Sequence, residues 1–177
     1  IRTIGDHFQI HPLIQEDIAH TGQRPKLDPQ ENYLYLVVKM LYFDDDRGGE
    51  LRAEQVSLLV GERNLISFQE DPGDVFDPVR TRIRNGRGHI RNRGPDYLAY
   101  ALLDVIIDHY FVVLETLGTR TEELEDVIME GASEDLEDDI HDLRRDLTFV
   151  RRMTWPMREV INQLDRLDSP LWADTNR

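Results

Sequence analysis

The sequence predicts an α+β fold, in which an antiparallel-rich mixed sheet packs between helices and a long acidic antiparallel helical hairpin follows. Two observations lead to this prediction. Three segments rich in β-branched and aromatic residues follow one another between residues 33 and 69, with short turns between them, which is typical of an antiparallel meander. Apolar residues at helical spacing then continue from residue 96 to residue 168, interrupted by one Gly-Ala-Ser break.

The first twenty residues have a helical pattern. The apolar residues at positions 1, 4 and 8 share one face of a first helix. Pro12 opens a second short helix over Leu13–Ala19, because the first turn of a helix tolerates proline. A loop over Gly22–Pro25 leads from this helix into the predicted sheet.

The predicted strands are Tyr33–Phe43, Gln55–Val60 and Leu65–Gln69. The turn Asp44–Gly49 separates the first two, and the hairpin signal Gly61–Asn64 separates the last two. Since consecutive strands joined by short links usually pair, we expect all three to form antiparallel neighbours.

Three further helices are predicted after the strands. One begins with Asp77 as N-cap and a first-turn proline and ends before Gly86. A much longer helix begins at Pro95 and runs to about Glu130, and another begins at Ser133, which is followed by several acidic residues.

The two long helices are each roughly 50 Å long and are joined by about three residues, so they must fold back as an antiparallel hairpin with Gly131 at the turn. Its tip, Glu122–Asp142, holds eleven carboxylates and neither lysine nor arginine, so we expect it to be exposed. Pro156 should bend the second helix. A 4-3 spacing marks the inner stripe of that helix: Leu136, Ile140, Leu143, Leu147, Val150, Thr154, Met157, Ile161 and Leu164. The predicted parts are an α/β portion over 1–95, the hairpin over 96–168 and the start of a further segment over 169–177.

Composition restricts the possible functions. The chain has 177 residues, a formal charge of −14 and no cysteine, which excludes disulfides, thiolate metal sites and thiol nucleophiles. The negative charge opposes binding to nucleic acid or to anionic lipid. The chain reads as a piece of a longer protein, with no signal peptide at its start.

One apolar segment, Tyr97–Leu114, is almost long enough to span a membrane. Asp104, Asp108 and His109 lie inside it, and a carboxylate at the centre of a spanning helix costs at least ~2.5 kcal/mol. We therefore interpret the segment as a buried helix of a soluble domain.

Motifs for catalysis are absent from the sequence, including G-x-S-x-G, the Walker loop and G-x-G-x-x-G. His7 and His11 are four residues apart but lack the glutamate of a zinc helix, and a capping or surface role is the simpler interpretation. The Asp44–Asp46 turn has Gln55 where a calcium loop needs glutamate. The six arginines between Arg80 and Arg93 lack interleaved aromatics, which favours pairing with carboxylates over nucleic-acid binding.

Two carboxylate groups remain as candidate metal ligands. Asp104 and Asp108 are four residues apart in the most apolar segment, where an unpaired carboxylate is expensive, so each must be protonated, paired with a cation or bound to a metal. Glu16 and Asp17 form a second pair at the end of a short helix. Carboxylate oxygens prefer Mg²⁺ or Ca²⁺ over softer ions. The residues alone leave a metal site and an ordinary ion pair both open.

The chain resembles the cytoplasmic domain of the CorA family of magnesium and cobalt transporters over nearly its whole length. Seven segments carry the resemblance in the family's order: HPLIQEDI (11–18), QRPK (23–26), ENYLYLVVKM (31–40), EQVSLLVG (54–61), GDVFDPVRTRIR (73–84), RGPDYLAYALLD (93–104) and WPMREV (155–160).

The resemblance implies a homopentameric transporter at the plasma membrane of a bacterium or archaeon, with this segment on its cytoplasmic face. It implies that residues 169–177 begin a stalk segment, and that the N-terminal part of the family's sheet is absent from this chain. It also implies regulatory Mg²⁺, for which Co²⁺ or other divalent ions can substitute, bound between neighbouring subunits. The implied ligands are Asp17 as principal ligand, Glu16 beside it and Asp104 at an adjacent second site, opposite an aspartate on a stalk helix that would follow Arg177. The family often has histidine directly before Gln-Arg-Pro, where this chain has Gly22, so a contribution of His20 stays open.

The resulting hypothesis is a regulatory, metal-sensing domain that is not an enzyme and binds no nucleic acid. Three alternatives are kept. The chain could belong to the zinc-transporting branch of the same superfamily. It could be a carboxylate-metal hydrolase that uses Glu16, Asp17 and Asp104 in one closed pocket, or an acidic adaptor without a ligand.

Overall fold

A computed structural model describes residues 1–130 and 136–173 of the chain. Helices and strands follow one another in the predicted order, with one additional strand at the start of the sheet, so the α+β fold class is confirmed. The elements are α1 (Arg2–His7), α2 (Pro12–Ala19), β1 (Lys26–Pro29), β2 (Tyr33–Asp44), the short 3₁₀ helix η1 (Asp45–Arg47), β3 (Glu50–Gly61), β4 (Leu65–Phe68), α3 (Asp77–Asn85), α4 (Pro95–Glu130) and α5 (Leu136–Asp165).

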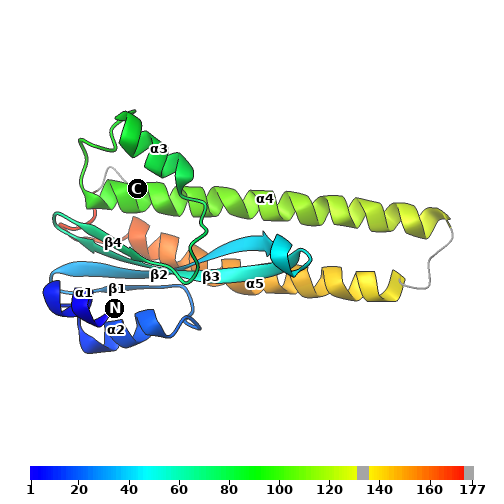
Figure 1. Cartoon of the computed structure of the whole chain (residues 1–177), viewed down its shortest axis with the longest axis horizontal. Coiled ribbons are helices and arrows are strands. Elements are labelled where there is room, and N and C mark those ends of the chain that lie inside the picture. The colour runs from blue at the N-terminus through cyan, green and yellow to red at the C-terminus, as the bar shows by residue number, and fades with distance from the viewer. Residues whose placement is uncertain (131–135, 174–177) are drawn as a thin grey trace.

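The strands form one sheet in the order β1-β2-β3-β4 (Figure 1), and every pairing in the described part of the chain is antiparallel. β2 and β3 pair from Tyr33 opposite Gly61 to Asp44 opposite Glu50. The predicted meander is therefore confirmed. β3 begins at Glu50 rather than at Gln55, because Leu51 is buried in the core and extends the strand.

The sequence did not predict β1. Two of its four residues are charged and it ends in Pro29, which is a poor strand signal. The strand pairs on one side with β2, with Lys26 opposite Val37, and a proline is tolerated at the edge of a sheet.

Helices cover both faces of the sheet. Leu34, Leu36 and Val38 of β2 pack in a large core with α4 and α5, whereas Tyr35 and Val37 pack in a second core with α2. Figure 1 shows α4 and α2 on opposite sides of the sheet. Because both faces are buried, β2 is an almost continuous apolar run instead of an alternating one.

The two long helices lie side by side and antiparallel, as predicted (Figure 1). In the 4-3 pattern of α5, the positions Leu143, Val150, Met157 and Leu164, seven residues apart, are buried. Ile140 and Leu147, in the other half of the pattern, are 44% and 46% exposed. The apolar pattern predicted from the sequence therefore includes residues that α5 does not bury in this structure.

A buried ion pair connects the two helices of the hairpin. Asp146 of α5 is 7% exposed and accepts a hydrogen bond from Arg120 of α4 at 2.8 Å. The acidic residues of the tip that the structure describes, from Glu122 to Glu130 and from Glu137 to Asp142, are exposed, as predicted. The predicted turn at Gly131 and helix start at Ser133 lie outside the described residues. α5 continues through Pro156, and the predicted bend there stays a prediction.

α4 is long and apolar enough to cross a membrane by length and composition. Its inner face, which includes Ala99, Ile106 and Leu117, nevertheless belongs to the large core beneath the sheet. This packing agrees with the interpretation of a buried core helix.

α3 has the predicted ends but a different N-cap. Phe76 precedes the helix, and no side chain caps it. Asp77 is the first helical residue and pairs with Arg80 at 3.2 Å, and Asp74 accepts a hydrogen bond from the Phe76 N–H at 2.8 Å. Gly86 ends the helix with φ +63°, in the left-handed region that favours glycine.

Candidate metal centre

α2 positions the first pair of candidate ligands. His11 precedes the helix, and its Nδ1 accepts a hydrogen bond from the Leu13 N–H at 3.3 Å, so the predicted capping role is confirmed. Ile14 and Ile18 are buried against the sheet and fix the rotation of the helix. Glu16 is exposed, and Asp17 is half-buried beside the sheet.

Asp17 is held by two contacts. Its Oδ2 accepts a hydrogen bond from the ammonium group of Lys26 at 2.5 Å, and its backbone carbonyl accepts one from Gln55 Nε2 at 3.1 Å. The side chains of Asp17 and Lys26 are 26% and 35% exposed. The carboxylate is therefore oriented and reachable from solvent, but a lysine already neutralises its charge.

Glu16 and His20 lie at the end of α2. The Nδ1 of the His20 ring donates a hydrogen bond to the Glu16 carbonyl at 3.0 Å, so this ring nitrogen is bound to the backbone. The Glu16 side chain is exposed next to Asp17 in sequence. Both side chains are hard oxygen donors of the kind that Mg²⁺ prefers. As adjacent residues of a helix, however, they do not face each other.

Asp104 lies on α4 and is exposed, as is Asp108. The sequence argument that these carboxylates are buried among apolar residues is therefore wrong. The apolar residues of this stretch, such as Leu103 and Ile106, turn toward the core and leave the two aspartates on the outer side of the helix. Asp104 lines a pocket of about 200 Å³ together with Asp165 of α5.

The structure does not bring the candidate ligands together within one chain. Glu16 and Asp17 belong to the helix on one face of the sheet, and Asp104 belongs to the helix on the other face (Figure 1). Across residues 1–130 and 136–173, no group of three histidine or carboxylate side chains is placed to hold a metal ion. The hydrolase alternative needs these three carboxylates in one pocket, whereas the sheet lies between Asp104 and the other two.

The remaining charged motifs have structural roles. Arg80 pairs with Asp74 and Asp77, and Arg91 donates to the backbone carbonyls of Ile83 and Arg84. Arg80 thus pairs with carboxylates as predicted, whereas Arg91 bonds to the backbone instead.

The Asp44 turn is likewise held by arginines. Asp44 lies 3.5 Å from Arg47 and 3.1 Å from Arg52, measured from its Oδ2 to the guanidinium nitrogens. These ion pairs satisfy the carboxylate without a calcium ion.

Sequence reasoning missed the Lys26–Asp17 ion pair. The two residues are nine positions apart and on different elements, and only the packing of α2 on the sheet brings them together. The one available signal was the presence of both residues in segments that carry the family resemblance.

Comparisons with known proteins agree with this architecture. A family model described as "CorA-like Mg2+ transporter protein" matches residues 1–177. The cobalt/magnesium transport protein CorA of Thermotoga maritima is 43% identical over 171 residues, which cover 97% of this chain and 48% of that protein. The chain thus spans about half the length of this relative.

Two solved structures share the fold. The soluble domain of CorA from Methanocaldococcus jannaschii superposes with a TM-score of 0.83 at 19% identity, covering 99% of this chain and 69% of that one. The ZntB cytoplasmic domain from Vibrio parahaemolyticus superposes with a TM-score of 0.78 at 16% identity, covering 96% of this chain and 66% of that one. Together with the match over residues 1–177, the 43% identity shows that the chain belongs to the CorA family of Mg²⁺ transporters.

Proposed function

We propose that this chain is the cytoplasmic regulatory part of a pentameric Mg²⁺/Co²⁺ transporter of the plasma membrane, and that it is not an enzyme. The 43% identity to a cobalt/magnesium transport protein supports the choice of ions. Because the chain spans about half of that relative, the pore would be formed by the rest of the protein.

The observation that supports metal sensing is the separation of the carboxylates. Each chain presents Glu16 and Asp17 on one side of the sheet and Asp104 on the other. A site that uses both sides needs two neighbouring copies, in which the donors of one subunit face acidic residues of the next. Mg²⁺ at Asp17, Glu16 and Asp104 would then stabilise the contact between subunits.

Electrostatic repulsion would oppose that contact when Mg²⁺ is scarce. Five copies of this segment, each at −14, together carry −70. Bound Mg²⁺ offsets this repulsion locally and favours the closed state of the pore. Its effect on gating is limited to the difference between its affinities for the closed and open arrangements.

Exposed apolar residues on both helices of the hairpin support a further protein partner. Phe111 and Val112 of α4 and Leu147 of α5 are exposed large hydrophobic residues. A surface of this kind marks an interaction site in soluble proteins. In the proposed pentamer, a following stalk helix or a neighbouring subunit would cover it.

The test is a melting series against Mg²⁺ on three proteins. The first is this chain, the second is the chain extended through the following stalk helix, and the third is the extended form with Asp17→Ala. We expect Mg²⁺ to raise the melting temperature of the extended form in a concentration-dependent way and to have little effect on the other two. Asp108→Ala in the extended form is the matched control and should retain the Mg²⁺ effect. Tight binding of Mg²⁺ at Asp17 in the monomeric chain would contradict the shared site.

The zinc-transporting branch remains the second candidate, because the ZntB cytoplasmic domain has a similar fold. Uptake of Mg²⁺, Co²⁺ and Zn²⁺ into proteoliposomes that contain the complete protein distinguishes the two. Saturable Zn²⁺ uptake without Mg²⁺ uptake would replace the proposed ion.

A further inference from the structure

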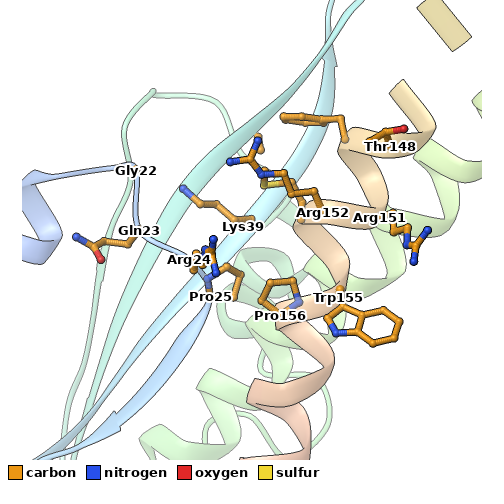
Figure 2. A pocket seen from close by; sticks show the side chains of 13 residues that line it. Gly22, Gln23, Arg24, Pro25, Lys39, Thr148, Arg151, Arg152, Trp155 and Pro156 are labelled. Atoms are coloured by element: carbon orange, nitrogen blue, oxygen red, sulfur yellow. The ribbon is translucent and has the colours of Figure 1, made fainter. Parts of the chain in front are cut away.

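A basic pocket lies between the sheet and α5, away from the candidate metal ligands. Its volume is about 720 Å³. It is lined by the loop Gly22–Pro25, by Lys39 of β2 and Ala53 of β3, and by residues of α5 between Thr148 and Pro156. Figure 2 shows Lys39 between the loop and α5.

Basic side chains from three segments reach this pocket. Figure 2 shows Arg24 from the loop, Lys39 from the sheet and Arg152 from α5 around the same space, while Arg151 points away from them. No aspartate or glutamate is among the residues that line it. In a chain with a formal charge of −14, such a concentration of positive charge requires an explanation.

Two arginines of the pocket lack, among the described residues, the carboxylate partners that Arg80 and Arg120 have. Arg80 and Arg120 form ion pairs with buried carboxylates. Arg24 and Arg152 form no ion pair within the described part of the chain. Their guanidinium groups are thus available to an external anion, which arginine binds through two parallel hydrogen bonds.

Lys39 adds a buried charge to the pocket. It is 6% exposed, and its ammonium group donates to two neutral acceptors, the Thr21 carbonyl at 2.6 Å and Gln55 Oε1 at 3.5 Å. Burial lowers the pKa of Lys39, and the negative charge of Glu70 opposes that shift. A buried ammonium without a carboxylate in contact is costly, and an anion in the pocket would reduce the cost.

The apolar lining limits what kind of anion fits. Phe149 and Met153 line the same space. Trp155 of α5 is 67% exposed and lies at the outer edge, with its ring directed away from Lys39 (Figure 2). The volume matches pockets that bind small organic ligands. A long nucleic acid would meet the repulsive field of the whole chain, whereas a small anion meets mainly the local cations.

We propose that this pocket binds a small anion with two or more linked phosphate groups, either as inorganic polyphosphate or as part of a nucleotide. The cations come from three separate segments, and a chain of linked phosphates offers them more anionic oxygens than a single phosphate does. The inference is independent of the metal-sensing function, because it uses none of Glu16, Asp17 and Asp104.

Calorimetric titration of the complete protein with sodium triphosphate, in buffer without divalent metal, tests the proposal. We expect triphosphate to bind at least about tenfold more tightly than orthophosphate, and Arg24→Glu and Arg152→Glu each to weaken it by about tenfold or more. Arg63→Glu, at an exposed position in the β3–β4 turn, is the control with the same charge change. It should alter the affinity by less than about twofold.

A second titration with ATP separates the two sources of the phosphate chain. Tighter binding of ATP than of triphosphate, with the gain lost in Trp155→Ala, would identify a nucleotide, because an exposed aromatic ring can stack on a base. Equal affinities that Trp155→Ala leaves unchanged would identify the phosphate chain alone.

Three outcomes would overturn the proposal. The first is that the complete wild-type protein does not bind triphosphate, although circular dichroism shows that the wild type and the variants are folded. The second is equal weakening by Arg63→Glu, which would indicate a general field effect. The third is a triphosphate affinity that neither Arg24→Glu nor Arg152→Glu weakens, which would place the binding site outside this pocket.

Discussion

Lys26 should restrain the binding of Mg²⁺ at Asp17, and Lys26→Gln should therefore strengthen it. In the structure the ammonium group lies 2.5 Å from Asp17 Oδ2. A metal ion that takes this oxygen must displace the lysine, which ends an ion pair of about 0.5–1 kcal/mol for partly exposed groups.

A displaced lysine would still repel the ion. For a divalent ion and an ammonium group about 5 Å apart, Coulomb's law in water gives about 1.5 kcal/mol, which physiological salt reduces by about half. The two contributions add up to about 1–2 kcal/mol, so Lys26→Gln should tighten Mg²⁺ binding about five- to thirtyfold.

The same substitution should have the opposite effect without metal. Loss of the ion pair should lower the melting temperature of the metal-free protein by about 2–4 °C, and at high Mg²⁺ the variant should become the more stable form. The assay is a melting series against Mg²⁺ on the complete protein at constant ionic strength, with Lys26→Arg as the charge-conserving control. Arg63→Gln removes an equal charge at a remote exposed position. If Lys26→Gln shifts the Mg²⁺ dependence no more than Arg63→Gln does, competition at Asp17 is refuted.

The other predictions concern stability and binding. Asp146→Ala breaks the ion pair between the hairpin helices and leaves Arg120 without its partner, so it should lower the free energy of unfolding in urea by about 2 kcal/mol. Asp142→Ala removes an exposed pair with Arg145 and should cost less than about 0.5 kcal/mol. Equal losses would contradict the role assigned to Asp146. Glu54 is 3% exposed, and burial raises its pKa. Its protonated form therefore contributes fully to stability below the ordinary glutamate pKa of about 4.3. This contribution is lost as the pH rises through the raised pKa of the folded protein. The stability of Glu54→Gln relative to the wild type should therefore increase between pH 4 and pH 7, and a flat difference in urea unfolding would refute this. Generic RNA and DNA should not bind at physiological salt in a gel-shift assay, and a salt-sensitive, sub-micromolar affinity would restore the arginine cluster as a functional site.

Much of the fold was predictable because its signals are local. Pro12, Pro95 and Gly86 mark helix ends through their own backbone preferences, and the long apolar strand Tyr33–Asp44 is recognisable from its side chains. β1 was not predictable in this way. Its residues become a strand through hydrogen bonds to β2, which no local pattern of four residues encodes.

The candidate ligands were predictable as residues but not as a site. The sequence identifies Glu16, Asp17 and Asp104 through the family resemblance, and their metal-binding role stays a prediction. Burial of Asp104 was inferred from its apolar neighbours, and that inference was wrong because a helix can turn a polar face outward within an apolar segment.

The sequence by itself determined the order of the elements other than β1, the acidic hairpin tip and the family, since all three depend on residue type and spacing along the chain. Only the tertiary structure placed Lys26 against Asp17, separated Asp17 from Asp104 by a sheet, and gathered Arg24, Lys39 and Arg152 around one pocket. The physical reason is that these relations join segments far apart in sequence. Contacts of that kind depend on which face of the sheet each helix covers, and no local spacing of residues records that choice.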